Sequence, residues 1–127
     1  MIMPYLTIAV SGLGGRGVFT TESIPAGTTI EISPVITLSP EERANVEKTG
    51  LFNYIFEWGE DYTGAAVALG YVSMYNHSYS SNCIYEMDFE NVEMRIRTVK
   101  PILKGEELTI NYNADPDDTT PIWFEAK

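Results

Sequence analysis

The sequence predicts a mainly β single domain, built from several small sheets with one short inserted helix. Three observations predict this fold class. Short runs rich in Val, Ile, Thr and aromatic residues recur along the chain, Gly, Pro and Asn separate them, and no regular alternation of strands with long helices is present. The chain has 127 residues, 44% of them hydrophobic, which is enough for one modest core. No linker or low-complexity stretch divides residues 1–127, so we treat them as one domain.

The first two predicted strands flank a glycine-rich segment at residues 12–17. Leu6 to Val10 is rich in β-forming residues, and residues 18–21 favour a second strand. The glycines between them have the spacing G-x-G-x-x-G of dinucleotide-binding loops, which requires a helix to begin at the last glycine. Here Pro25 and Gly27 would end any such helix within two turns. The sequence therefore argues against a dinucleotide site.

Two segments from opposite ends of the chain share one pattern. Residues 24–32 and 102–110 both read as an apolar residue, two residues, Gly, two residues, and then alternating apolar residues. The glycine permits a turn with positive φ, and the alternation predicts a half-buried strand after it. We expect two turn-then-strand corners that frame one β-structure. The pattern is common in β-proteins and does not by itself indicate a shared origin.

The clearest helix signal begins at Ser39. Ser39 can cap a helix, Pro40 suits its first position and Glu42 completes a capping box, so a helix of about ten residues is predicted before Gly50. The aromatic segment at residues 51–58 is compatible with a strand or a short helix. Further strands are predicted at residues 65–69, 83–89 and 92–99, with a turn at residues 90–91 between the last two.

Composition narrows the classes of partner and cofactor. Eighteen acidic residues against eight basic ones give a net charge of −10, which disfavours non-specific nucleic-acid binding and suits a basic partner. The acidity is equally compatible with a role in solubility alone. One Cys and one His cannot build a structural zinc site, and the acidic tail lacks an EF-hand pattern, so no metal is predicted. The start of the chain resembles neither a signal peptide nor a membrane span, which predicts a cytoplasmic protein.

Two motifs carry the functional prediction. Asn76-His77-Ser78 is followed by Asn82-Cys83, and residues 105–112 read GEELTINY, ending in Tyr112. In this order and spacing they resemble the signature motifs of the SET domain, the fold of most protein lysine methyltransferases. The resemblance extends from Arg16 to Tyr112, nearly the whole chain. It implies a β-clip-like fold with a knot-like crossing near its C-terminus, an insert at about residues 39–63 and a C-terminal cap at about residues 113–127.

The resemblance implies methylation of a lysine side chain on a histone or another basic protein, with S-adenosylmethionine as the methyl donor. Tyr112 would be the catalytic tyrosine that orients the lysine amine. For Tyr85 and Trp123, core packing is an alternative to the role in the site that the resemblance implies. Tyr54 and Tyr85 would line the lysine channel, and Trp123 would fold back over the cofactor. The remaining cofactor contacts implied by the family are Arg16, Gly17, Asn76 and His77.

This chain also departs from the family pattern. Asn111 stands where Asp is frequent, and no cysteine follows Cys83, so the zinc-binding segment that closes the channel in many larger relatives is absent. These departures leave open an alternative function, a peptide- or S-adenosylmethionine-binding module with little or no transferase activity. Exposed strand edges would allow a homodimer. A nuclear or host-targeted location would follow if the source were viral, eukaryotic or a secreted effector.

Overall fold

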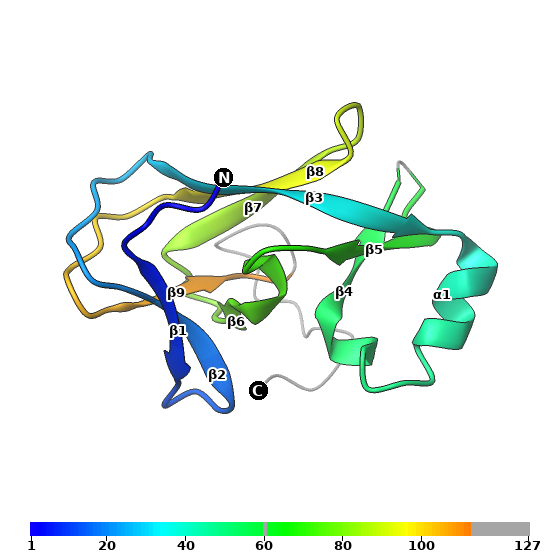
Figure 1. Cartoon of the computed structure of the whole chain (residues 1–127), viewed down its shortest axis with the longest axis horizontal. Coiled ribbons are helices and arrows are strands. Elements are labelled where there is room, and N and C mark those ends of the chain that lie inside the picture. Colours follow the sequence, from blue (N-terminus) through cyan, green and yellow to red (C-terminus); the bar gives the residue numbers. More distant parts are fainter. Residues whose placement is uncertain (60, 113–127) are drawn as a thin grey trace.

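The computed structural model describes residues 1–59 and 61–112, which form two β-sheets with one α-helix at an end of the molecule (Figure 1). In chain order the elements are β1 (Leu6–Val10), β2 (Arg16–Thr20), β3 (Thr29–Leu38), α1 (Pro40–Val46), the 3-10 turn η1 (Phe52–Tyr54), β4 (Ile55–Trp58), β5 (Gly64–Ala68), the 3-10 turn η2 (Val72–Met74), β6 (Asn76–His77), β7 (Cys83–Asp88), β8 (Glu93–Thr98) and β9 (Glu107–Ile110). The mainly β fold class predicted from the sequence is confirmed.

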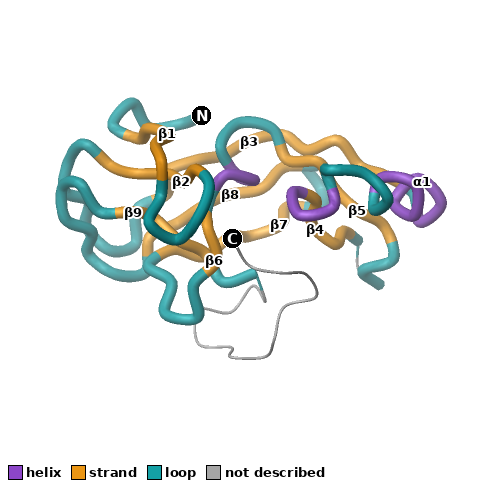
Figure 2. The backbone as a smooth tube through the Cα atoms, turned by 90° about the horizontal axis from the view of Figure 1, so that it is seen from below, coloured by secondary structure: helices purple, strands orange, loops and turns teal. Residues whose placement is uncertain are grey.

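The larger sheet has five strands in the order β4-β5-β3-β8-β7, all of them antiparallel. Strand β3 is its long central member. Its first half pairs with β8 and its second half, from Val35 to Leu38, pairs with β5. Hairpins add β4 beside β5 and β7 beside β8, so β4 and β7 form the two edges. Figure 2 shows the strands running along the molecule, with α1 at one end and the β1–β2 hairpin toward the other.

The smaller sheet brings distant parts of the chain together. Its order is β1-β2-β9-β6, with β1, β2 and β9 antiparallel and β6 parallel to β9. Strand β2 follows the glycine-rich loop directly and no helix begins there, in agreement with the argument against a dinucleotide site. The β6–β9 pairing joins the two sequence motifs, because β6 contains Asn76 and His77 while β9 lies within GEELTINY.

The two segments of similar pattern are neighbours. The backbone N–H of Ile24 donates to the carbonyl of Ile102, and the reverse bond has the same length, 2.8 Å. Gly27 and Gly105 have φ of 78° and 88°, so both turns use the positive φ that glycine allows. The expected turn-then-strand corners are therefore present. The strands that follow them, β3 and β9, enter different sheets.

Helix α1 begins as predicted and ends early. Ser39 and Glu42 form a reciprocal capping box, with bonds of 3.0 and 3.1 Å. The helix nevertheless has seven residues, Pro40–Val46, where about ten were expected. None of these residues is buried, and a helix without a buried face gains little from being extended. The ambiguous segment 51–58 contains both alternatives, the turn η1 and then strand β4.

The predicted strand at residues 92–99 is shorter in the structure. Strand β8 begins at Glu93, because Val92 has φ of 55° and belongs to the turn after β7. The core lies between the sheets and includes Val18, Ile30, Ile96, Leu108 and Ile110. In residues 1–59 and 61–112, no helix is long and apolar enough to span a membrane.

Candidate active site

Tyr112 is hydrogen-bonded to residues 75–77 through both its backbone and its side chain. Its backbone N–H donates to Nδ1 of His77 over 3.1 Å, and its hydroxyl donates to the backbone carbonyl of Tyr75 over 2.8 Å. The rings of His77 and Tyr112 are 5.0 Å apart between centroids. The parallel pairing of β6 with β9 creates this arrangement, because it places His77 opposite Ile110, two residues before Tyr112. The two motifs therefore meet at one point.

His77 is neutral in this environment. Nδ1 accepts a hydrogen bond, so the ring proton is assigned to Nε2, and burial lowers the pKa of the imidazole. Nε2 is itself buried and has no hydrogen-bond partner among the described residues. Buried polar atoms are normally paired, so this N–H is a donor to which a bound molecule could attach.

Asn76 and Gly17 belong to a second cluster, centred on Glu107. The Asn76 side-chain N–H₂ donates to the carbonyl of Arg16 over 3.1 Å and to Oε2 of Glu107 over 2.8 Å. Ser11 donates to the other carboxylate oxygen over 2.6 Å. A Cβ at Gly17 would overlap the Glu107 carboxylate and approach Asn76. Gly17 was expected among the cofactor contacts; in the structure the chain's own side chains occupy the space that a Cβ at this position would take.

Glu107 and Ser11 were not identified from the sequence. One signal for Glu107 was available in the sequence. It is a charged residue at the start of the apolar strand β9, and a charged side chain at a strand end near a site can point into that site. Asn82 has a structural part in the same region. Its amide group both donates to the Glu107 carbonyl over 2.9 Å and accepts from the Thr109 N–H over 2.8 Å, which fixes the loop after β6 to β9.

Three residues around β6 and β2 have polar groups of the kinds that hold a charged cofactor: Asn76, His77 and Arg16. Among the described residues Asn76 Oδ1 accepts no hydrogen bond, so strand β6 offers an unused acceptor at Asn76 and an unused donor at His77 Nε2. Arg16 is exposed at the start of β2, and its backbone carbonyl accepts the hydrogen bond from Asn76. Together they offer an acceptor for an ammonium group, a donor for a ring nitrogen or carbonyl, and a cation for a carboxylate. Trp123, expected over the cofactor, lies outside the described residues.

Three aromatic residues, Tyr54, Phe56 and Tyr85, lie near Tyr112 and are called the aromatic wall below. The Tyr85 hydroxyl donates to the Tyr112 carbonyl over 3.1 Å, and the Tyr85 ring lies 5.3 Å from that of Phe56 between centroids. Tyr54 lies close enough to Tyr112 to affect its ionisation. Tyr85 is 8% exposed and belongs to the core, so its ring packs in the core while its hydroxyl reaches the site. The structure thus brings Tyr54, Tyr85 and Tyr112 together, and adds Phe56, which the sequence analysis did not single out.

Burial keeps both site tyrosines protonated. It raises the pKa of Tyr112, with smaller contributions from Tyr54 and Glu107, and it raises the pKa of Tyr85 in the same direction. At neutral pH each is therefore a hydroxyl rather than a phenolate. Tyr112 can orient a group by hydrogen bonding, but it is a poor general base.

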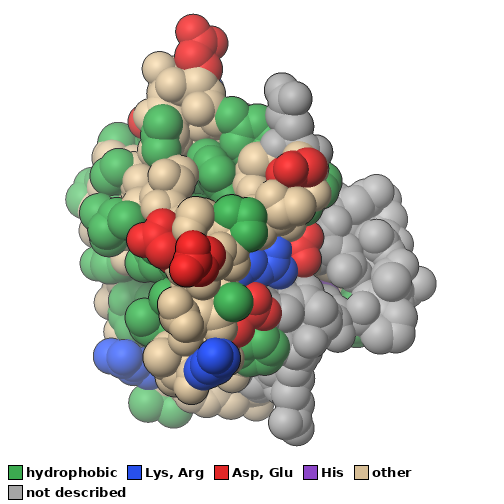
Figure 3. Space-filling view, turned by 90° about the vertical axis from the view of Figure 1, so that its right-hand side faces the viewer, with side chains coloured by type: hydrophobic (Ala, Val, Ile, Leu, Met, Phe, Trp, Pro, Cys, Tyr) green, Lys and Arg blue, Asp and Glu red, His purple; other side chains and the backbone are tan. Residues whose placement is uncertain are grey.

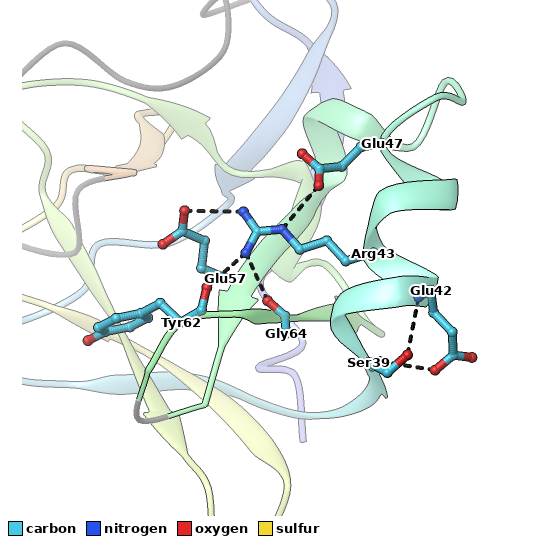
Figure 4. A network of polar contacts seen from close by, with 7 residues as sticks. All are labelled: Ser39, Glu42, Arg43, Glu47, Glu57, Tyr62 and Gly64. Atoms are coloured by element: carbon cyan, nitrogen blue, oxygen red, sulfur yellow. Dashed lines mark hydrogen bonds and ion pairs between the residues drawn. The ribbon is translucent and has the colours of Figure 1, made fainter.

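Arg43 joins the parts of the expected insert, about residues 39–63, to one another (Figure 4). From α1 its guanidinium reaches the hairpin between β4 and β5, donating to the carbonyls of Tyr62 over 2.8 Å and Gly64 over 3.1 Å. It also forms ion pairs of 3.2 Å with Glu47 and Glu57. These contacts hold α1 against the strand that carries Phe56, so the insert and the aromatic wall are parts of one framework.

Comparisons with known proteins agree with this geometry. A model of the family described as the SET domain matches residues 15–113. A histone-lysine N-methyltransferase of Schizosaccharomyces pombe, described as H3 lysine-37 specific, is 40% identical over 112 residues, which span 87% of this chain and 71% of that protein.

Solved structures are similar as well. A Plasmodium falciparum protein assigned to the histone methyltransferases superposes with a TM-score of 0.71 at 32% identity, covering 87% of this chain and 95% of that one. A ctPRC2 structure superposes with a TM-score of 0.74 at 22% identity, covering 88% of this chain and 15% of that one, and shows likeness of fold alone.

Proposed function

The chain belongs to the SET domain family and is a protein-lysine methyltransferase, and we propose that it uses S-adenosylmethionine to methylate a lysine on a basic protein such as a histone. One observation carries the proposal. The Tyr112 hydroxyl lies 2.8 Å from the Tyr75 carbonyl, immediately before the Asn76-His77 pair and beside the aromatic wall. The Tyr112 hydroxyl therefore lies beside the motif that carries two unused polar atoms and beside a desolvated aromatic surface, which supports a place for methyl donor and amine there.

The cofactor would lie against β6 and the start of β2. Asn76 Oδ1 would accept a hydrogen bond from the ammonium group of the cofactor, and His77 Nε2–H would donate to a ring nitrogen or carbonyl of the cofactor. Arg16 would pair with the carboxylate of the cofactor, which would lie beside the Gly17 backbone. When bound, S-adenosylmethionine supplies a methyl group activated by a positively charged sulfur. Glu107 keeps Asn76 in place by holding its N–H₂ group, which leaves Oδ1 directed elsewhere. Trp123 would cover the bound molecule.

The lysine amine must lose its proton before it can accept a methyl group. A free lysine has a pKa of about 10.4, so neutralising it at pH 7 requires roughly 4 to 5 kcal/mol. Burial between Tyr54 and Tyr85 would lower that pKa by excluding water, and the ring faces would still attract the cation as it enters. Tyr112 remains protonated and directs its proton to Tyr75, so its oxygen would accept an N–H of the amine and orient the nitrogen lone pair.

Tyr85 would limit how many methyl groups are added. Its hydroxyl is fixed to the Tyr112 carbonyl and borders the space in which a methylated amine would have to rotate. Removing the hydroxyl enlarges that space. A Tyr85→Phe enzyme should therefore yield a larger share of more highly methylated product, as measured by mass spectrometry of a peptide substrate.

A basic substrate matches the surface. The net charge is −10, and Figure 3 shows acidic side chains spread over the face that carries α1, where Glu41, Glu42 and Glu47 lie. Long-range attraction would concentrate a lysine-rich chain near this surface. Strand β4 is an edge of the larger sheet and borders the aromatic wall, so an extended peptide could add to it as a further strand.

The test is transfer of radiolabelled methyl groups from S-adenosylmethionine to histones and other lysine-rich proteins. Tyr112→Phe should lower kcat at least tenfold, since a hydrogen bond to the reacting amine is worth about 1.5 to 3 kcal/mol, while calorimetric affinity for the cofactor is kept. Tyr5→Phe, which removes a hydroxyl near the start of β1, is the matched control and should retain wild-type kcat. Equal rates in Tyr112→Phe and wild type would refute the role of Tyr112. Cofactor binding without transfer would favour the binding-module alternative, and the lack of both would refute the proposal.

A further inference from the structure

A carboxylate is buried on the far side of Tyr75 from the active site. Glu31 lies near the start of β3 and is 0% exposed. Its Oε2 accepts from the Ser33 hydroxyl and the Tyr71 N–H, each over 2.7 Å, and its Oε1 accepts from the Tyr75 hydroxyl over 2.9 Å. All three partners are donors, so the group is bound as an acceptor. Among the described residues no Lys or Arg pairs with it; burial raises the pKa of the Glu31 carboxyl, while its three hydrogen bonds and the N-terminal ammonium act in the opposite direction.

Such a burial is expensive. Moving a carboxylate out of water costs several kcal/mol, and a well-packed apolar side chain of similar size is often as stable or more stable at such a position. Hydrogen bonds offset part of this cost without explaining why a carboxylate is present. The position of its partners suggests a reason, because two of the three donors flank η2, the turn that leads into the first motif.

Tyr75 links the carboxylate to the catalytic tyrosine. Its side chain is 1% exposed and ends at Glu31, while its backbone carbonyl accepts the Tyr112 hydroxyl over 2.8 Å. Glu31 also holds Tyr71, so it fixes the residues immediately before and after η2. The position of the carbonyl that directs the Tyr112 proton is therefore set by an anchor in the core.

The turn before η2 is shaped around the same group. Gly70 has φ of 67°, and a Cβ there would overlap both the Ser33 hydroxyl and the Glu31 carboxylate. The next residue back is tied to β3, because the Leu69 N–H donates to the Pro34 carbonyl over 3.0 Å. The chain thus closes tightly over the carboxylate before it enters η2, which leaves Tyr71 and Tyr75 little freedom to shift.

We propose that Glu31 is a positioning residue for methyl transfer: acting through Tyr75, it holds the carbonyl that orients the Tyr112 hydroxyl. The inference rests on the proposed function. Glu31 touches neither the cofactor contacts nor the aromatic wall, so its loss should act on the chemical step. A role confined to stability would lower the melting temperature and leave kcat unchanged below it.

The experiment compares Glu31→Gln, Tyr75→Phe and their double mutant. Each single change should lower kcat at least fivefold, with KM for a peptide and Kd for S-adenosylmethionine changed less than twofold. Because both act through one hydrogen bond, the double mutant should be no slower than the slower single mutant, within a factor of two. Multiplicative losses, or an unchanged kcat in Tyr75→Phe, would overturn the proposal. If Glu31→Gln fails to fold, Tyr75→Phe still tests the proposal, because it removes only the hydroxyl that bonds to Glu31.

A matched control separates positioning from stability. Thr98 is also 0% exposed, and its hydroxyl donates to the Pro25 carbonyl and accepts from the Thr28 N–H, in a turn away from the site. Thr98→Val should lower the melting temperature to a similar extent while kcat stays at the wild-type value. An equal loss of kcat in Thr98→Val would mean that general destabilisation explains the effect.

A second readout does not require turnover. In protein labelled with ¹³C at the tyrosine ring carbon that bears the hydroxyl, the Tyr112 signal is identified by its loss in Tyr112→Phe. That signal should shift in Glu31→Gln and Tyr75→Phe and stay in place in Thr98→Val. An unmoved signal would refute the link even if kcat fell. If the wild type transfers no methyl group, the proposed function fails, while this shift still decides whether Glu31 positions Tyr112.

Discussion

Gly17 offers a direct test of the Glu107 cluster, which includes residues proposed to contact the cofactor. It is buried in β2, and a Cβ there would overlap Oε2 of Glu107 and lie 2.9 Å from Nδ2 of Asn76. The overlapping atom is the end of a flexible side chain, so Gly17→Ala should still fold. The carboxylate would have to move instead, and the bonds that it accepts from Ser11 and Asn76 would be weakened or lost.

The magnitude follows from those bonds. A hydrogen bond to a charged group contributes about 1.5 to 3 kcal/mol, and losing one while straining the other would lower the free energy of unfolding by about 2 to 3 kcal/mol. For a domain of this size that corresponds to a fall in melting temperature of about 10 °C. Asn76 would also lose an anchor, so affinity for S-adenosylmethionine should fall by about tenfold, or about 1.4 kcal/mol.

Circular dichroism would follow thermal unfolding, and calorimetry would measure cofactor affinity. Gly12→Ala is the matched control, because a Cβ at that position meets no atom within 4 Å and its backbone φ is ordinary. It should shift the melting temperature by no more than about 2 °C, which is the range of most surface substitutions. If Gly17→Ala behaves like Gly12→Ala in both assays, Glu107 does not organise this site.

Three predictions concern Cys83 and Val92, outside the site. Burial raises the pKa of the Cys83 thiol to about 12, so native protein at pH 8 should react with iodoacetamide at least about a hundredfold more slowly than urea-unfolded protein, and comparable rates would contradict this burial. The raised pKa also means that Cys83 contributes stability below about pH 8.5 that is lost as pH rises toward 12, which denaturation at several pH values would detect. Val92 has φ of 55°, which strains a β-branched residue. Val92→Gly should therefore stabilise the fold by about 1 kcal/mol and raise the melting temperature by about 4 °C. A lower melting temperature would show that the contacts of the Val92 side chain stabilise the fold by more than the backbone strain costs.

Local signals in the sequence were sufficient for several elements. Ser39 and Glu42 lie three residues apart, so their capping box depends only on nearby backbone, and the same holds for the positive φ at Gly27 and Gly105. The predicted end of α1 was wrong because it does not depend on nearby residues alone. Helix length depends on whether a face is buried, which residues 40–50 do not reveal by themselves.

The candidate site divides in the same way. Tyr112, Asn76 and His77 were identifiable because each belongs to a contiguous motif. The structure brings Tyr112 and His77 within hydrogen-bonding distance, while Asn76 bonds to Arg16 and Glu107. Tyr85 illustrates the limit of sequence reasoning. The sequence left core packing and a place beside the channel as alternatives for Tyr85, and only the tertiary structure shows a ring in the core whose hydroxyl extends to the Tyr112 carbonyl.

By itself the sequence determined the mainly β class, the turns, the start of the helix and the identity of the motif residues, because each depends on residues a few positions apart. Tertiary structure decided which buried carboxylate supports which motif. Glu31 reaches Tyr75 across 44 positions, and Glu107 reaches Ser11 across 96. Such contacts leave no periodic trace along the chain, since a polar side chain on a strand looks the same whether water or a distant residue satisfies it. Only the packing of the two sheets selects its partner.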